Sequence, residues 1–342
     1  MQVLLDWAVS QFGSSQEGSS AQDIFQAMHH PDTVRAEHEK EVTELTNDKL
    51  LQHLLYASPS IGEVDPAKTS HRIISISPIF GPPFDTDRFD IQFKSKPIGD
   101  RVIGMVKCFE YEEALQLIKF CRNVQGGNVF AREVFEAIGH RLLIGRTSIY
   151  RSMFSTYKMI AQGTDDAPIF TTATRPSGSK FFTHRTPRTL TSVNLDDPFP
   201  NGDRPLETLY FVPTSSSNPL IDSFAIDYSS SKRNEVNAEI WIFQMTLSGR
   251  SPGSSSGYEQ VKTVVKAAQA YGRIWLEENQ TPSGTRSRSP RVTIATTVHY
   301  VFVCPYEHTA RTWAMPNGWL SIQEGVSSTA ECFLVHLDVI LP

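Results

Sequence analysis

The sequence lacks the marks of several large protein classes. It has no G-x-x-x-x-G-K-[S/T] loop, so a P-loop nucleotide hydrolase is not indicated. No repeat with a period of about 20–50 residues is visible, which argues against a solenoid or a propeller. No apolar run reaches the roughly 18 residues that a membrane helix needs, so we expect a soluble protein that does not enter a membrane.

The chain also has few cysteines and no strong excess of one charge sign. The four cysteines, Cys108, Cys121, Cys304 and Cys332, form no C-x-x-C pair, which argues against a zinc site and for a reducing compartment. The net charge of −5 indicates no nucleic-acid partner by itself. Residues 1–13 lack the cationic start of a signal peptide, so a location in the cytoplasm or nucleus is favoured.

The length and the apolar content are sufficient for two folded units. With 342 residues and 39% hydrophobic side chains, we predict domains at 1–125 and 126–342, divided at Gly126-Gly127. The first is smaller and reads as helical over 1–57, strand-like over 69–103 and helical over 110–121. Apolar residues within 33–54 predict an amphipathic helix, either solvated on one face or bound to a protein partner.

The second domain alternates between helical and extended patterns. A helix is predicted over 128–145, short extended pieces over 146–208, a strand over 240–245, a helix over 258–278 and a covered strand over 292–305. The last apolar segment fits either a helix or a strand. We therefore predict an α/β (α+β) fold with a mixed sheet flanked by helices.

The central stretch from Leu209 to Leu247 contains the main candidate site. Asp222 follows a short extended segment, and Gln244 interrupts the apolar strand 22 positions later. Metal-dependent nucleases of the restriction-endonuclease type place such groups on neighbouring strand ends, where Mg²⁺ polarises a phosphate and activates water. We predict Asp222, Gln244 and Glu136 as metal ligands and catalytic residues, with Lys262 as a further catalytic cation.

A local basic bias follows the helix over 128–145. Residues 141–190 contain eight Lys or Arg and two acids, with aromatic side chains between them. This is the composition that a phosphate backbone attracts, although a solvated loop region has the same composition. The predicted nucleic-acid contacts, with DNA preferred, are Arg141, Arg146, Arg175, Lys180, Arg185 and Arg188.

Several of these segments together resemble the C-terminal region shared by Crinkler-type effectors and retrotransposon-hot-spot-type proteins. They are NPLIDSF at 218–224, IFQMT at 242–246, VFE with HRLL within 134–143, YVFVCP at 300–305 and SHRII at 70–74. The resemblance covers roughly residues 69–306. It implies a restriction-endonuclease-like fold of the PD-(D/E)xK type, a DNA-directed effector or toxin activity, Mg²⁺, and action in a nucleus, including that of a host.

Two departures from this family leave other hypotheses open. The family's histidine after the Gln-x-Thr strand is replaced by a serine-rich segment, and its P-loop module is absent, so residues 1–125 fit a remnant of that module. One alternative is a catalytically inactive interaction protein on the same fold, in which Gln244 is a hydrogen-bonded core amide. A hydrolase with a Ser/His/Asp arrangement would need His140, His184, His299 or His308 as its base.

Overall fold

The computed structural model describes about half of the 342 residues. They are scattered positions between 29 and 40, then 74–78, 89–93, 96–106, 108–109, 113–114, 116–117, 129–144, 154–162, 169–176, 188–196, 198–199, 206–214, 220–232, 234–247, 255–279, 292–305, 312–314 and 325–335. The chain divides into two compact units, Met1–Ile138 and Gly139–Pro342. The division falls inside helix α7 (Val129–Leu143), later than the Gly126-Gly127 break.

The first unit contains a two-stranded antiparallel sheet. Strands β1 (Ile74–Pro78) and β2 (Phe89–Phe93) pair with Ile76 opposite Ile91. Their alternation of apolar and polar residues is what predicted two strands in this region, and that prediction is confirmed. The predicted amphipathic helix and its protein partner lie mostly outside the described residues.

One prediction in this unit is wrong. The extended run expected to continue to residue 103 ends at β2, and Lys96–Val106 form helix α5. Pro97 suits the first turn of a helix because its fixed backbone angle is already helical and its missing N–H is not needed there. Val102 and Val106 lie one turn apart and are both buried, so the helical period accounts for them better than strand alternation.

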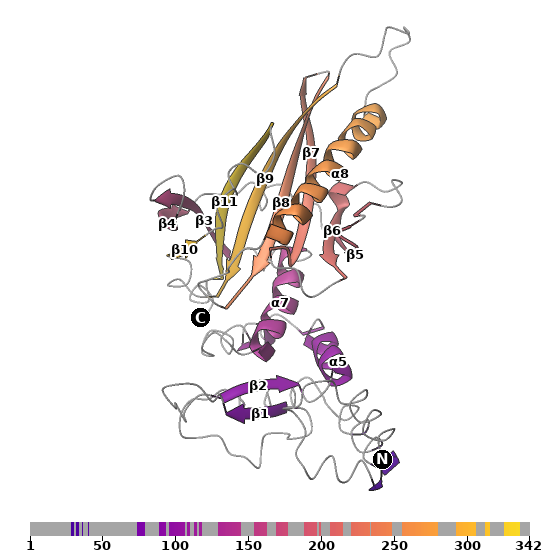
Figure 1. Ribbon diagram of the computed structural model, residues 1–342, viewed down its shortest axis with the longest axis vertical. Helices are drawn as coiled ribbons and strands as arrows, with labels where there is room; N and C mark the ends of the chain where they lie inside the picture. Colours follow the sequence, from indigo (N-terminus) through magenta and orange to yellow (C-terminus); the bar gives the residue numbers. More distant parts are fainter. Residues whose placement is uncertain are drawn as a thin grey trace. The chain divides into compact units, whose positions relative to one another are not determined.

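In the described part of the second unit, nine strands form one mixed sheet in the order β10-β4-β3-β11-β9-β8-β7-β6-β5 (Figure 1). Neighbours are parallel at β11-β9, β9-β8 and β6-β5 and antiparallel elsewhere. The strands are β3 (Phe154–Gln162), β4 (Ile169–Pro176), β5 (Thr189–Val193), β6 (Leu209–Pro213), β7 (Ser223–Lys232), β8 (Glu235–Met245), β9 (Thr293–Cys304), β10 (Thr312–Ala314) and β11 (Val326–Val335).

The centre of this sheet follows the predicted order of elements. Strand β8 is followed by helix α8 (Ser255–Asn279), and the chain returns as β9, parallel to β8. A parallel neighbour needs such a crossover, because a tight turn can join only antiparallel strands. The last apolar segment is the strand β11. The prediction of a mixed α/β sheet with flanking helices is therefore confirmed, while 146–208 forms more extended structure than expected.

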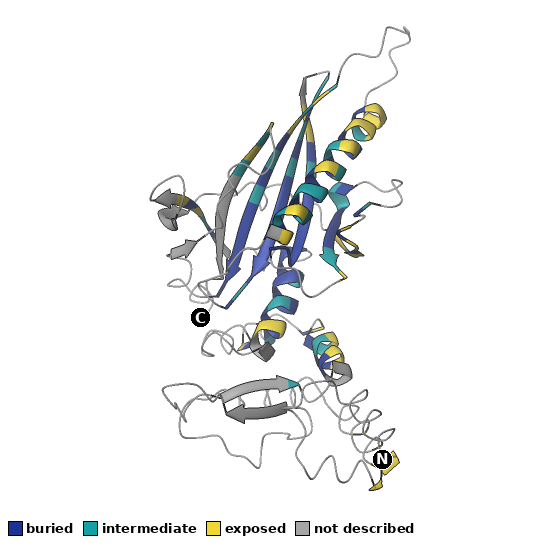
Figure 2. Ribbon diagram, viewed as in Figure 1, coloured by how far each residue is buried: buried dark blue, intermediate teal, exposed yellow. Residues whose placement is uncertain are grey.

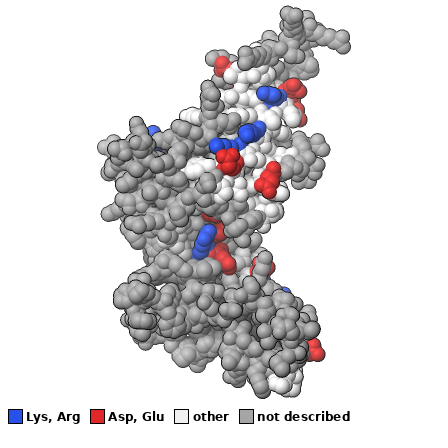
Figure 3. Space-filling model, in the orientation of Figure 1, with Lys and Arg blue, Asp and Glu red and all other residues white. Residues whose placement is uncertain are grey.

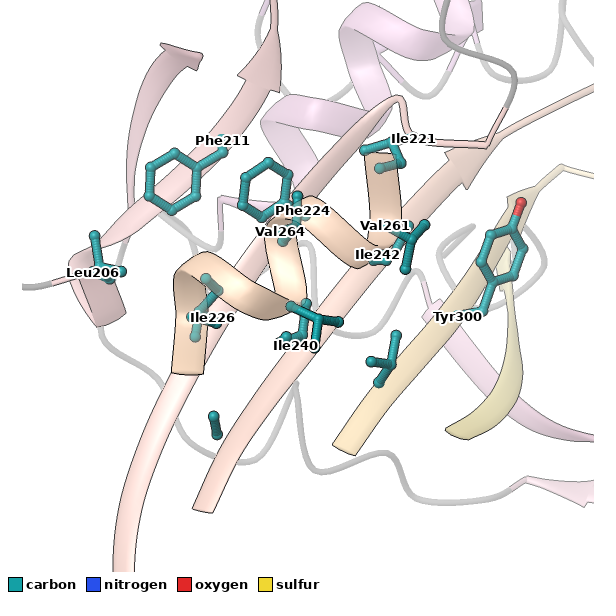
Figure 4. Close-up of a cluster of buried hydrophobic side chains, with 14 of the residues drawn as sticks. Leu206, Phe211, Ile221, Phe224, Ile226, Ile240, Ile242, Val261, Val264 and Tyr300 are labelled. Atoms are coloured by element: carbon teal, nitrogen blue, oxygen red, sulfur yellow. The ribbon is translucent and has the colours of Figure 1, made fainter. Parts of the chain in front are cut away.

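Helix α8 covers one face of the central strands. Figure 2 shows the strands buried along most of their length and the helix buried on one side only. In Figure 4, Val261 and Val264 of α8 lie over Ile240 and Ile242 of β8. Each such side chain stabilises the fold by about 1.5–3 kcal/mol when fully buried. The buried positions of α8 recur at helical spacing, at Val261, Val264, Val265, Ala268, Tyr271 and Leu276.

The end of α7 that belongs to the second unit lies against the other face. The ring of His140 meets that of Tyr210 edge-on, with 5.8 Å between ring centroids. A Cβ on Gly139 would lie only 2.4 Å from Sδ of Met245 on β8, so the absence of a side chain there permits close packing. Both faces of the central strands are thus covered, as their nearly continuous apolar sequences require.

Candidate functional site

The structure brings Asp222 and Gln244 together at one end of the sheet. Asp222 immediately precedes β7, and Gln244 is the second-last residue of β8. The β7–β8 pairing aligns Ser223 with Phe243, and the Asp222 N–H donates to the Phe243 carbonyl at 3.0 Å. Two residues that are 22 positions apart in sequence are therefore neighbours at the strand ends.

Both polar side chains are buried and bound by protein donors. The Asp222 carboxylate accepts the Met245 backbone N–H through Oδ2, with 2.6 Å between the atoms. The Gln244 amide accepts the Tyr300 hydroxyl through Oε1. Exposure is 8% for Asp222 and 7% for Gln244. The Asp222 carboxylate therefore adds a hydrogen bond at the end of the β7–β8 pairing, and the Gln244 amide links β8 to β9.

Tyr300 is a site residue that the sequence interpretation missed. It lies on β9, opposite Ile242, and is fully buried. Burial raises the pKa of its hydroxyl well above the usual value, and the nearby Asp222 and Tyr258 add to the rise. A neutral hydroxyl is therefore maintained as a donor to Gln244. The sequence did contain a signal for this residue, because a tyrosine inside a covered strand needs a hydrogen-bond partner for its hydroxyl.

The start of α8 lies beside the same strand ends. A Cβ on Gly257 would lie 2.7 Å from Cγ of Leu220, so the helix approaches this segment as closely as a glycine allows. Burial raises the pKa of Tyr258, one residue further on, to about 12. We refer to Asp222, Gln244, Tyr258 and Tyr300 as the strand-end cluster.

The strand-end cluster, as described, does not fit a magnesium site. Mg²⁺ prefers charged oxygen ligands in an octahedral arrangement and keeps several waters. The cluster offers one carboxylate, and the oxygens that accept from Met245 and Tyr300 are already directed at protein donors. Within the described ranges, no group of three or more His, Cys, Asp or Glu residues could hold a metal ion. The magnesium hypothesis stays a prediction.

The two other predicted catalytic residues lie on helices. Glu136 belongs to the part of α7 in the first unit and is half-buried. Burial raises the pKa of Glu133, and the charges of Glu136 and Asp100 raise it further. Lys262 lies on α8 in the second unit and donates to Glu259, at 2.7 Å. The described contact of Lys262 is this pair within one helix, which lowers the pKa of Glu259.

Arg188, one of the predicted phosphate contacts, is buried and joined to neighbouring strands. It is 7% exposed, and its guanidinium forms an ion pair with Asp227. It also donates to the carbonyls of Leu209 and Ile226, both at 3.2 Å. These bonds join the chain just before β5 to β6 and β7, so the side chain is not available to a ligand in solution. Asp227 also accepts the Trp241 indole N–H at 3.1 Å.

The other predicted nucleic-acid contacts are spread over the fold. Arg141 is half-buried on α7 and Arg175 lies on β4, whereas Arg146, Lys180 and Arg185 lie outside the described residues. The basic segment contributes β3 and β4 to one side of the sheet and β5 to the opposite edge. It therefore forms no single continuous strip within the described structure. Figure 3 shows acidic and basic side chains next to each other on the described surface.

A second buried polar chain lies on the face opposite α8. His140 Nδ1 and the Tyr210 hydroxyl are 3.0 Å apart, and the same hydroxyl is bonded to Ser223. Tyr210 and Ser223 have no exposed surface. This chain ties α7 to β6 and β7 and keeps the serine away from any substrate in solution.

The remaining parts of the Ser/His/Asp hypothesis are not assembled either. The His299 ring stacks on Trp241 with centroids 3.9 Å apart, and His184 and His308 lie outside the described residues. Gly253–Gly257 has the spacing G-x-S-x-G, but β8 ends at Met245, ten positions before Ser255. A nucleophile of this type directly follows its strand, so the position of Ser255 in the sequence does not match that motif.

Comparisons of the chain with protein-family models, with curated proteins and with solved structures find no match. Among the described helices, none is long and apolar enough to cross a membrane.

Proposed function

We propose that the second unit is a divergent restriction-endonuclease-like domain of the Crinkler and retrotransposon-hot-spot type that binds nucleic acid without cleaving it. Support for the fold comes from the order of its central elements. An acid precedes β7, an amide lies near the end of β8, helix α8 crosses over one face, and β9 returns parallel to β8. This is the order that the resemblance implies for the nuclease-like domain.

The observation that carries the proposal is the engagement of the two candidate ligands. Asp222 accepts from the Met245 backbone and Gln244 accepts from Tyr300, both inside the protein. For a metal to bind there, these hydrogen bonds must be exchanged for coordination, and the N–H and hydroxyl left behind must find other partners. The geometry therefore favours a structural role for the pair.

Nucleic-acid binding is assigned to the strands formed by the basic segment. Lys158 is exposed on β3, and Arg175 lies on the neighbouring strand β4. Cations on adjacent strands suit the spaced phosphates of a nucleic-acid backbone, and such contacts make affinity strongly dependent on salt. This part of the proposal rests on β3 and β4 and does not involve the strand-end cluster.

Fluorescence anisotropy with labelled duplex DNA, single-stranded DNA and RNA tests binding. We expect saturable binding at low salt, and we expect the double variant Lys158→Glu/Arg175→Glu to bind more weakly with a salt slope reduced by about 2. The matched control is Lys262→Glu/Lys266→Glu, which removes two cations from α8 and should leave the slope unchanged. Absence of saturable binding to all three probes, or an equal loss in both double variants, would overturn the proposal.

A second candidate function, Mg²⁺-dependent phosphodiester hydrolysis, is favoured by the placement of Asp222 beside Gln244. A plasmid-cleavage assay with Mg²⁺ separates the two functions. We expect equal and negligible cleavage by the wild-type protein and Asp222→Ala. Cleavage that depends on Mg²⁺ and is lost in Asp222→Ala would establish hydrolysis and overturn the structural role of the pair.

A further inference from the structure

One face of the sheet in the second unit carries exposed side chains beside a stacked pair of rings. Strands β3, β11, β9 and β8 are neighbours in this order (Figure 1). On β3, Tyr157 and Met159 pack against the hydrophobic core. Lys158 and Ile160 alternate with them and therefore lie on the opposite face. Both are exposed, Ile160 to 49%, so this face of β3 presents a cation next to an apolar side chain.

His299 and Trp241 lie on the same face as Lys158. Glu331 of β11 pairs with Lys158 on one side and with Val301 of β9 on the other, and paired residues share a face. His299 is two positions before Val301, so it shares that face, as does its partner Trp241 on β8. The two rings are stacked, with centroids 3.9 Å apart and planes 12° apart. His299 is half-buried and Trp241 is 1% exposed, so the imidazole is the ring that solvent reaches.

The sign of the charge differs between the two sides of this stack. Lys158 lies on the β3 side, whereas Glu239 of β8 lies two positions before Trp241 on the same face. Glu239 is paired with Asp227 of β7, and Arg188 balances one of these two half-buried carboxylates. Phosphates are therefore attracted to β3 and repelled from the far side of the stack. A nucleic-acid strand with its backbone along β3 would direct its bases toward the stacked rings.

We propose that this face binds single-stranded nucleic acid, with a phosphate at Lys158 and a base packed on Ile160 and the His299 ring. This rests on the proposed nucleic-acid function and names the form of ligand that the surface on β3 and β4 takes. A duplex is a poorer match because its base faces are stacked on each other and its exterior presents phosphates. Unstacked bases have an apolar face that packs on aromatic side chains, histidine included.

Fluorescence anisotropy with the full chain tests the form of the ligand. The probes are labelled oligothymidine, a duplex of the same length, and an abasic strand with the same backbone as the oligothymidine. We expect oligothymidine to bind about tenfold more tightly than either of the others at the same salt concentration, because it alone offers unpaired bases. A parallel titration with oligouridine distinguishes DNA from RNA, because the tighter of the two strands identifies the source.

Three variants connect the bases to the named side chains. His299→Ala should lower the affinity for oligothymidine about tenfold and leave the salt slope unchanged, because stacking involves no phosphate. His299→Phe keeps an aromatic ring and should bind like the wild type. Ile160→Thr should also weaken binding. The matched control Ile274→Thr removes an isoleucine of α8 that is 43% exposed, and it should change nothing.

The results distinguish a failure of this inference from a failure of the proposed function. Absence of saturable binding to every probe refutes both. Equal binding of oligothymidine, duplex and abasic strand, or undiminished binding by a folded His299→Ala, refutes the base contacts alone and leaves the phosphate contacts of Lys158 and Arg175 in place. The comparison of probes uses the wild-type protein, so it decides the question even if His299→Ala fails to fold.

Discussion

Replacing Asp222 by alanine distinguishes a structural acid from a catalytic one. In the structure, the carboxylate accepts the Met245 backbone N–H at 2.6 Å in a buried position. Alanine leaves this N–H without an acceptor, which costs about 1–3 kcal/mol of folding free energy. For a unit of this size, that is a fall of about 2–4 °C in the thermal midpoint for each kcal/mol.

Asparagine at the same position is the matched control. Its amide oxygen can still accept the Met245 N–H, so the loss should be smaller, about 0.5–1.5 kcal/mol. Urea unfolding of the wild type, Asp222→Ala and Asp222→Asn, monitored by tryptophan fluorescence, gives these differences. Each measurement is made with and without Mg²⁺.

The measurements with Mg²⁺ add a second test, because a ligand that binds the native state raises the free energy of unfolding. If Asp222 held Mg²⁺ with a Kd of about 1 mM, the wild type would gain about 1.4 kcal/mol at about 10 mM metal, and Asp222→Ala would gain little. We expect no such difference. A structural role for Asp222 is wrong if Asp222→Ala is more stable than the wild type, or if Mg²⁺ stabilises the wild type alone.

Three further predictions concern the surrounding fold. Arg188→Lys keeps the charge but loses the multiple bonds of the guanidinium, and urea unfolding should show a loss of about 1–3 kcal/mol; an unchanged midpoint contradicts its structural role. Gly257→Ala should destabilise by about 1–3 kcal/mol because its Cβ meets Leu220, whereas Gly104→Ala, with nothing within 4 Å, should not; equal midpoints in thermal melts contradict this packing. The raised pKa of Tyr300 contributes free energy of unfolding that is fully present below about pH 10 and is lost as the pH rises further. The free energy of unfolding of Tyr300→Phe, measured by urea titration, should therefore fall less than that of the wild type above this pH. The same dependence on pH in both proteins would contradict this prediction.

The local sequence pattern predicted burial correctly where the period of a single helix or strand determines which residues face inward. The spacing of Val261, Val264, Val265 and Ala268 predicts the inward stripe of α8, and all four are buried. The covered strand over 292–305 is β9 in the middle of the sheet. Helix α5 was missed because Pro97 and Gly99 interrupt a segment that also alternates like a strand.

The partners of the candidate site could not be read from the sequence because they depend on strand register. Gln244 meets Tyr300, 56 positions away, only because β8 and β9 are parallel with a particular alignment. Arg188 was counted with a basic stretch, yet its ion-pair partner Asp227 lies 39 positions further along the chain. A count of local charge cannot distinguish a phosphate-binding arginine from one that joins strands.

We propose that the acid and the amide at the ends of β7 and β8 hold the sheet together through the hydrogen bonds that they accept, in place of holding a metal. The most direct measurement is the anomalous X-ray signal of crystals grown with Mn²⁺, a stand-in for Mg²⁺. We expect no manganese peak at Asp222 and an intact hydrogen bond from the Met245 N–H to its carboxylate. A peak at about 2.0–2.3 Å from oxygens of both Asp222 and Gln244 would contradict it.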